Sequence, residues 1–355
     1  MWNTKTMHLH KRFVPLFLPV LLLLSLLQGC GTGETKVSKS GFYFDTIITI
    51  TLYGTTDESY LDSCFSLAKK YEQKFSSTIE TSEISKINHA GNTYTTVSDE
   101  TIELLSAGLE YGRISDGKFD ITIGKVSDLW KFSEIAKNLE TEDNEADVSV
   151  LPDKRQITEE LSHVNYQNVI IDGNRVKRKD PSAEIDLGGI AKGYIADKMR
   201  EYLNKEGITT GIINLGGNIL TLGPKKNDQT YTIGIQKPFA DSGTPLGELK
   251  VKDASVVSSG IYERYYRIDG EIYHHILDTE TGYPVENHLN QVTIISKKSM
   301  DGDAMSTTCF ALGLEDGMQL VESLEGIEAI FVLDDGTIHC TSGIGRDKEI
   351  QFQEE

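Results

Sequence analysis

The sequence has 355 residues, of which 54 are acidic and 35 basic, so its net charge at neutral pH is −19. This acidity excludes proteins that bind nucleic acids through a basic face, and it argues against electrostatic adhesion to anionic lipids. A chain of this length can bury a core without disulfides, and it allows one large domain or two closely packed ones.

The N-terminus has the pattern of a signal peptide. Three basic residues come first, Lys5, Lys11 and Arg12. They precede an apolar run, residues 13–27, which is shorter than the roughly 20 residues of a membrane-spanning helix and is interrupted by two prolines. We therefore expect residues 1–29 to be removed, which leaves 32 basic and 54 acidic residues and a net charge of −22.

The apolar run ends in Leu-Leu-Gln-Gly-Cys, and a small residue before Cys30 resembles a bacterial lipobox. We expect Cys30 to be acylated by several chains, palmitate among them. Several are needed because one acyl chain alone anchors a protein only weakly. The alternative is an ordinary secretory signal with an incidental cysteine. Residues 30–40 are small and polar and predict a tether, and residues 41–355 predict the folded domain.

Three further cysteines, Cys64, Cys309 and Cys340, cannot form a closed disulfide framework because their number is odd. Their wide spacing also excludes a CxxC redox or zinc motif. We expect buried, inert thiols, with one disulfide among them as the alternative.

Secondary-structure patterns follow in chain order. Residues 44–53 alternate and predict a strand, residues 59–75 and 100–115 predict helices, and the acidic stretch 133–150 predicts a surface insertion, either a loop or a solvated helix. Short apolar runs predict strands at residues 169–171, 212–215, 231–235, 254–257, 291–296 and 329–333. Helices are expected at residues 190–204, 304–312 and 315–324. This order favours one α+β domain with mixed β-sheets and flanking helices over a doubly wound nucleotide fold.

Three glycine-rich clusters could carry chemistry. Residues 184–194 place Gly188 and Gly189 before a helix, where backbone amides can approach a phosphate and Lys192 adds a positive charge. Close helix packing explains the glycines equally well. Residues 115–124 and 214–218 are, by themselves, typical of turns.

A fourth cluster combines residues 273–282 and 301–308. Asp303 and Thr307 are four residues apart, so on a helix they share a face and offer two hard oxygen donors for Mg²⁺. Alternatively, Asp303 caps a helix that begins at the next residue, and taken alone this is the simpler interpretation. His275 is a candidate general base. His274 lies beside it, however, so one of the two histidines could merely occupy a position in a strand without a chemical role.

Taken together and in this order after a lipobox, the motifs resemble the ApbE family of FAD:protein FMN transferases. The motifs are FDTIITITLY (residues 44–53), SEISKIN (82–88), SDGKFDITIG (115–124), IDLGGIAKGY (185–194), NLGGN (214–218), SSGIYER (258–264), HHILDTETG (274–282) and DGDAMSTT (301–308). Each string is weak, but the ordered set is specific and spans most of the chain.

The resemblance implies an ApbE-like, T-fold-related domain that splits FAD at its pyrophosphate. The FMN half would be attached by a phosphoester to a threonine or serine of an exported acceptor in a membrane electron-transfer complex, and AMP would leave. Positioning and charge neutralisation would dominate catalysis, with Mg²⁺ bound between the phosphates. The chain would then act as a lipid-anchored enzyme on the outer side of the cell membrane.

The resemblance also assigns residues. The metal ligands would be Asp303, Thr307 and the carbonyl of Gly189, with Ser306 as second choice. The FAD contacts would be Phe44, Thr78, Phe119, Asp120, Asp186, Lys192 and Ile276, with Asn218 and Ser259 nearby. His275 would deprotonate the acceptor hydroxyl, or would merely hold its loop through hydrogen bonds.

Some positions depart from the family pattern, chiefly around the flavin. The departures are Phe44-Asp45 in place of Met-Gly, Thr78 in place of an aromatic, Ile121 and Thr279 in place of proline, and Asn218 in place of aspartate. Three rival functions therefore stay open: an exported FAD-binding protein, an FAD pyrophosphatase without an acceptor, and a solute-binding lipoprotein. The last predicts two similar lobes and no metal pair.

Overall fold

The computed structural model describes residues 35–139, 144–346 and 348–355. The predicted signal peptide and Cys30 lie outside the described residues. The chain from Lys36 to Glu355 forms one unit with α and β elements, as the sequence predicted. Within the described ranges, no helix is long and apolar enough to cross a membrane.

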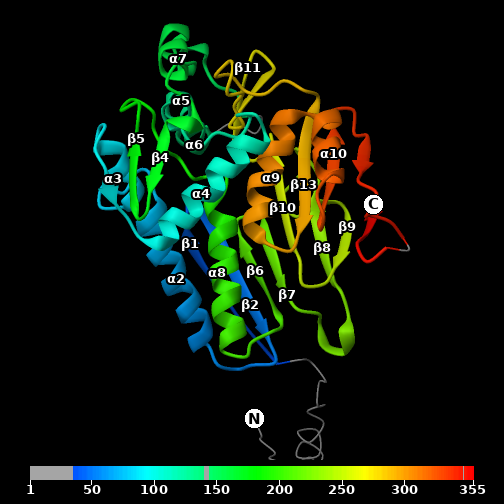
Figure 1. The fold of residues 1–355 in the computed structure, drawn as a ribbon. Coiled ribbons are helices and arrows are strands. Elements are labelled where there is room, and N and C mark those ends of the chain that lie inside the picture. The colour runs from blue at the N-terminus through cyan, green and yellow to red at the C-terminus, as the bar shows by residue number, and fades with distance from the viewer. Residues whose placement is uncertain (1–34, 140–143, 347) are drawn as a thin grey trace, which may run out of the picture. The chain divides into compact units, whose positions relative to one another are not determined.

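An eight-stranded sheet in the order β1-β2-β6-β7-β10-β13-β14-β15 is central to the fold (Figure 1). Its strands are β1 (Lys36–Tyr43), β2 (Thr46–Tyr53), β6 (Gly211–Leu215), β7 (Asn218–Leu222), β10 (Ser255–Gly260), β13 (Leu289–Ser296), β14 (Ile327–Leu333) and β15 (Ile338–Cys340). The sequence led us to expect sheets of mixed direction, but these neighbours all pair antiparallel. Short turns such as that between β6 and β7 can only join antiparallel strands.

Three smaller sheets complete the β structure. They contain β16 (Gln351–Glu354), β9 (Pro245–Val251) and β8 (Tyr231–Gln236); β3 (Thr95–Thr96), β5 (Arg175–Arg178) and β4 (Val169–Asp172); and the hairpin of β11 (Tyr265–Ile268) and β12 (Glu271–His274). Buried side chains of β8 and β9 pack against one face of β10, β13 and β14. This face of the central sheet is therefore covered by a second sheet.

Helices cover the opposite face and one end of the molecule (Figure 1). They are α2 (Ser59–Phe75), α3 (Glu83–His89), α4 (Asp99–Ile114), α5 (Gly124–Trp130), α6 (Phe132–Asn138), α7 (Lys154–Leu161), α8 (Ala191–Lys205), α9 (Ser299–Leu312) and α10 (Leu314–Glu322), with short 3-10 turns at Val148–Val150, Tyr166–Asn168 and Lys226–Asp228. Alternate residues Ile48, Ile50 and Leu52 of β2 are fully buried in the main core beneath these helices. The alternation of buried and less buried side chains along β2 therefore shows which face of the sheet points toward the helices.

Two boundaries differ from the sequence expectation. β2 begins at Thr46, because Phe44 and Asp45 have positive φ values of 55° and 57° and form the turn from β1. β1 begins at Lys36, so the end of the expected tether, residues 36–40, is an edge strand paired with β2. The expected insertion, residues 133–150, contains most of α6 and a 3-10 turn, while residues 140–143 lie outside the description.

Helix α9 begins at Ser299, several residues before the predicted start at residue 304. The reason is a cap that comes from another helix. Asp197 of α8 accepts hydrogen bonds from the backbone N–H groups of Ser299 and Met300, at 3.0 and 2.9 Å. These are first-turn amides that a helix cannot satisfy itself, so Asp197 extends α9 toward its N-terminus.

Helices α8 and α9 touch at Gly193. An ideal Cβ on this residue would lie 2.2 Å from the carbonyl oxygen of Ser299 and 2.6 Å from the Cα of Met300. The neighbours are backbone atoms, which cannot rotate away as a side chain could. Gly193 therefore permits the main-chain approach that brings the two helices together.

We predict that Gly193→Ala destabilises the protein by about 2 kcal/mol or more, because the helices must separate to admit a methyl group. Urea denaturation measures this loss. Gly234→Ala is the matched control, since its Cβ would meet only Pro245, at 3.8 Å, and we expect little change. Equal stability of the two variants would show that α8 and α9 do not depend on this contact.

A buried histidine fixes the segment after β12. His274 is 4% exposed, its Nε2 bonds to the carbonyl oxygen of Val285 at 3.1 Å, and its Nδ1 accepts from the N–H of Ile276 at 3.3 Å. An imidazole that donates from one nitrogen and accepts at the other must be neutral. Burial accordingly lowers the pKa of His274 to about 4.

This depressed pKa predicts a pH-dependent stability. The contribution of His274 is complete above the unfolded pKa near 6.5 and is lost as the pH falls toward the folded pKa of about 4. We expect the stability gap between wild type and His274→Gln to narrow by roughly 2 to 3 kcal/mol between about pH 7.5 and 4.5. Urea denaturation across this range measures the gap, and a constant gap would contradict a neutral, buried His274.

Candidate functional site

The predicted phosphate loop, residues 186–189, is held by its own polar groups. Asp186 accepts from the N–H of Gly188 at 2.6 Å, and its backbone N–H donates to the carbonyl of Ile121 at 2.8 Å. Lys192, in the first turn of α8, donates to the carbonyl of Gly188 at 3.1 Å. The loop, the lysine and the N-terminus of α8 thus form one electropositive corner.

Asp303 joins this corner from α9. It is 4% exposed, and its Oδ2 accepts from the N–H of Gly193 at 2.9 Å, while its Oδ1 lies 3.6 Å from Nζ of Lys192. The interpretation of Asp303 as the cap of its own helix is wrong, because it lies inside α9. Instead, it satisfies a first-turn amide of α8.

Hydroxyl groups lie next to this carboxylate. Ser259, at the end of β10, bonds with Ser306 at 2.8 Å and with Thr307 at 3.3 Å. An ideal Cβ on Gly189 would be 3.8 Å from Oγ1 of Thr307, which places the glycine loop beside the hydroxyls. The structure therefore brings together Gly189, Asp303, Ser306 and Thr307, the four predicted metal-site residues.

This group differs from the common all-protein metal sites. Among the described residues, no cluster of three or more His, Cys, Asp or Glu could hold an ion. One carboxylate, two hydroxyls and a carbonyl nevertheless suit Mg²⁺, which keeps several waters and takes further ligands from substrate phosphates. The donor set fits a magnesium ion that binds together with a phosphate.

His275 is the first residue after β12. Its backbone N–H donates to the carbonyl of Arg264 at 3.1 Å, and within the described residues its Nδ1 is enclosed without a hydrogen-bond partner. Burial, and then the positive charges of Arg264 and Lys192, lower the pKa of His275 to about 3. The imidazole is therefore neutral at physiological pH.

Besides Asp186, Lys192 and Ser259, which are described above, six FAD contacts were predicted, and they fall into two groups. Phe119 and Ile276 are buried, and Phe119 lies 3.1 Å from the ideal Cβ position of Gly189. Asp120 is turned away, because its carboxylate accepts from Thr122 at 2.7 and 2.6 Å and from the N–H of Tyr166 at 2.7 Å. The side chain of Asp120 therefore holds the turn rather than facing a free volume.

The other three predicted contacts lie at the margins. Asn218 is buried and accepts from the Ser299 hydroxyl at 2.6 Å, so it supports the start of α9. Thr78 bonds locally with Ser76, and Phe44 belongs to the β1–β2 turn, where its N–H donates to Glu72 at 2.7 Å. None of these contacts reaches the carboxylate and hydroxyl groups around Asp303.

Two functional side chains were not singled out from the sequence. Arg264 lies within the SSGIYER motif, which could have indicated it, and its charge acts on His275. Asp197 is a 9%-exposed acid on the buried face of α8 and anchors α9. An acidic residue at an apolar helical position was the available signal for Asp197.

The cysteines are free thiols, with Cys64 and Cys309 buried and Cys340 partly so. Burial raises the pKa of both Cys64 and Cys309 to about 12. The expectation of inert thiols is confirmed for these two, and the disulfide alternative is wrong among the described residues.

Comparison with known proteins shows which family the chain resembles. Residues 44–331 match the model of the ApbE family. A protein named FAD:protein FMN transferase from Klebsiella pneumoniae is 37% identical and covers 86% of this chain and 92% of its own. A protein of the same name from Treponema pallidum is 28% identical, and the match covers 91% of this chain and 93% of that protein.

Solved structures give the same result. The crystal structure of the ApbE protein from Thermotoga maritima superposes with a TM-score of 0.77 at 32% identity, covering 87% of this chain and 97% of that one. The family model spans residues 44–331, which is most of the chain. The chain therefore belongs to the ApbE family.

Proposed function

We propose that this protein transfers the FMN half of FAD to a threonine or serine hydroxyl of another exported protein. The acceptor oxygen forms a bond to the FMN phosphorus, the bond from that phosphorus to the AMP oxygen breaks, and AMP leaves. The hydroxyl proton passes to a base. The observation that carries the proposal is the convergence of Lys192, the α8 N-terminus and the buried Asp303 beside a hydroxyl cluster.

The electrostatics of the corner suit a pyrophosphate. The dipole of α8, whose N-terminus lies here, and the ammonium of Lys192 attract anionic oxygens. Mg²⁺ held by Asp303, Thr307 and the Gly189 carbonyl would neutralise charge on the phosphates and on the departing AMP.

His275 is the proposed base for the acceptor hydroxyl. With a pKa of about 3 in the free protein it is a weak base, first because it is buried and then because the positive charges of Arg264 and Lys192 disfavour a further positive charge. A bound pyrophosphate offsets those charges and raises the basicity of the imidazole. The role in which His275 only holds the loop is weakened by its enclosed Nδ1, which makes no hydrogen bond within the described residues.

The decisive experiment incubates the mature chain with FAD, Mg²⁺ and the extracytoplasmic acceptor domain of a membrane electron-transfer subunit. We expect covalent, fluorescent flavin on the acceptor and one AMP for each flavin transferred. Intact bound FAD would instead indicate a binding protein. Free FMN and AMP without labelled acceptor would indicate a pyrophosphatase.

In this assay, Asp303→Asn should reduce transfer by roughly a hundredfold or more, since it removes the charge that holds the metal. The amide oxygen can still accept from the N–H of Gly193, so we expect the unfolding free energy to change by about 1 kcal/mol or less. Mg²⁺ titration by calorimetry with bound FAD gives a readout independent of turnover. Retained Mg²⁺ affinity in a folded Asp303→Asn protein would exclude the metal assignment.

The proposed location is the outer face of the cell membrane, with Cys30 as the lipid anchor. The lipobox-like sequence and the acidic charge of −22 after cleavage support this, because the protein lacks the excess of basic residues that binds lipid electrostatically. We predict that Cys30→Ser moves the protein from the membrane fraction to the soluble fraction without changing transfer in detergent. Cys64→Ser is the control and should stay in the membrane fraction. If Cys30→Ser also stays there, Cys30 is not the anchor.

A further inference from the structure

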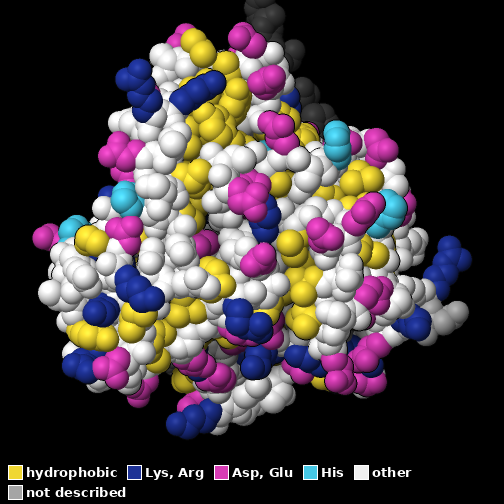
Figure 2. All heavy atoms as spheres, turned by 45° about the horizontal axis from the view of Figure 1, so that its top comes forward, with side chains coloured by type: hydrophobic (Ala, Val, Ile, Leu, Met, Phe, Trp, Pro, Cys, Tyr) yellow, Lys and Arg dark blue, Asp and Glu magenta, His cyan; other side chains and the backbone are white. Residues whose placement is uncertain are grey.

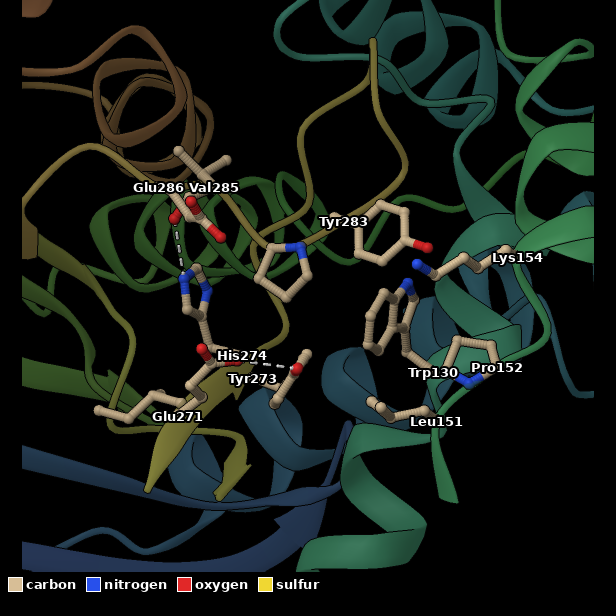
Figure 3. A pocket seen from close by; sticks show the side chains of 12 residues that line it. Trp130, Leu151, Pro152, Lys154, Glu271, Tyr273, His274, Tyr283, Val285 and Glu286 are labelled. Atoms are coloured by element: carbon tan, nitrogen blue, oxygen red, sulfur yellow. Dashed lines mark hydrogen bonds between the residues drawn. The ribbon is translucent and has the colours of Figure 1, made fainter. Parts of the chain in front are cut away.

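A cavity of about 560 Å³ lies beside the flavin site but is not part of it. Its lining is largely aromatic and apolar, with Trp130, Tyr273 and Tyr283 facing one another (Figure 3). Trp130 is fully buried, and its indole N–H donates to the carbonyl of Gly282 at 2.9 Å, so the floor is rigid. Leu151 and Pro152, which precede α7, form the opposite wall.

The cavity and the flavin site share one wall. His274 lines the cavity, whereas the neighbouring His275 is influenced by Arg264 and Lys192 of the flavin site. His275 directly follows His274 in the chain, and its backbone N–H donates to the carbonyl of Arg264 at 3.1 Å. A ligand in the cavity would therefore lie next to the segment that carries the proposed base.

The main chain of β12 faces this cavity. The four consecutive residues of β12, Glu271–His274, all line it, which alternating side chains alone would not produce. Among the described strands, β12 pairs with β11 only. Its other edge is thus available to pair with an extended segment of another chain, a recognised mode of peptide binding.

The rim carries charges of opposite sign. Glu271 and Glu286 are exposed near the Tyr273 hydroxyl, which donates to Glu271 at 3.2 Å. Burial and the carboxylates of Glu271 and Glu286 raise the pKa of Tyr273. Lys154 lies toward Tyr283 (Figure 3). Figure 2, which turns this end of the molecule forward, shows hydrophobic side chains exposed among acidic ones.

We propose that this cavity docks an extended segment of the acceptor protein, which pairs with the free edge of β12. The segment packs a large apolar side chain against Tyr273 and Tyr283, which Trp130 supports from below, and places a lysine or arginine between Glu271 and Glu286. This inference rests on the proposed function, and it assigns the surface by which that function selects its protein substrate.

The acceptor fits this cavity better than the other possible occupants do. A second copy of the mature chain carries the same net charge of −22 and is repelled. The basic residues of this chain's own N-terminal segment, Lys5, Lys11 and Arg12, lie in the part that cleavage of the predicted signal peptide removes. The acceptor, in contrast, must bring its hydroxyl to His275, the residue next to His274.

The test reverses the rim charge with the double variant Glu271→Lys/Glu286→Lys, using the mature chain, FAD, Mg²⁺ and the acceptor domain described above. We expect the acceptor KM to rise roughly tenfold, as two weakened charge contacts imply, with the FAD KM and FAD affinity unchanged. Glu248→Lys/Glu349→Lys is the matched control, because it changes net charge equally at exposed positions on and next to a different sheet. It should leave both KM values unchanged.

Hydrogen exchange gives a second readout. Adding acceptor should slow exchange at the amides of β12, and the reversed rim should abolish this protection. Each of three results would overturn the proposal. The first is an unchanged acceptor KM in the rim variant, and the second is a loss of its FAD affinity. The third is protection of β12 that depends only on the enzyme's own concentration, which would indicate a second copy of the enzyme as the occupant. If the wild-type chain labels no acceptor at all, the proposed transferase function itself is wrong. The wild-type reaction alone therefore distinguishes failure of the function from failure of the docking proposal.

Discussion

The main-chain contact between α8 and α9 at Gly193 determines the geometry of the whole site. Ser299 and Met300 approach so closely that only glycine fits at this position. The contact places Asp303 where it accepts from the Gly193 amide, and it places Asp197 where it caps α9 in return. Each helix therefore supplies the missing hydrogen-bond partner of the other, and this exchange fixes a buried carboxylate beside the phosphate loop.

Local patterns in the sequence predicted the elements that bury a regular face. Helix α2 was predicted with the observed bounds, because its apolar spacing faces the sheet over its full length. Strands β5 and β11 were missed, since they are short and each contains arginine. The start of α9 was also missed, because its cap is contributed by Asp197, about a hundred residues earlier in the sequence, and local rules see only adjacent residues.

The residues of the site were predictable where the chemistry is local. Helix spacing put Asp303 and Thr307 on one face, but taken alone Asp303 was the simpler choice for a cap, and the resemblance to the ApbE family supplied the metal assignment. The structure places these residues and the glycines before α8 together. The orientation of a side chain was not predictable in the same way. Asp120 belongs to a conspicuous motif, yet Thr122 and Tyr166 use both of its oxygens. Tertiary hydrogen bonds decide whether such a carboxylate faces a ligand.

The two adjacent histidines show how the proposed enzyme avoids wasting FAD. A transferase must keep water from replacing the acceptor hydroxyl, and a base that is active at all times would activate water equally well. Burial, and then the positive charges of Arg264 and Lys192, hold the basicity of His275 low, and a bound pyrophosphate offsets the charges. His274 is locked to Val285 and Ile276, so the imidazole of His275 is carried on a rigid segment. In the proposed reaction, charge therefore sets the order of events: FAD binds first, His275 then becomes basic, and only a docked acceptor supplies a hydroxyl within its reach.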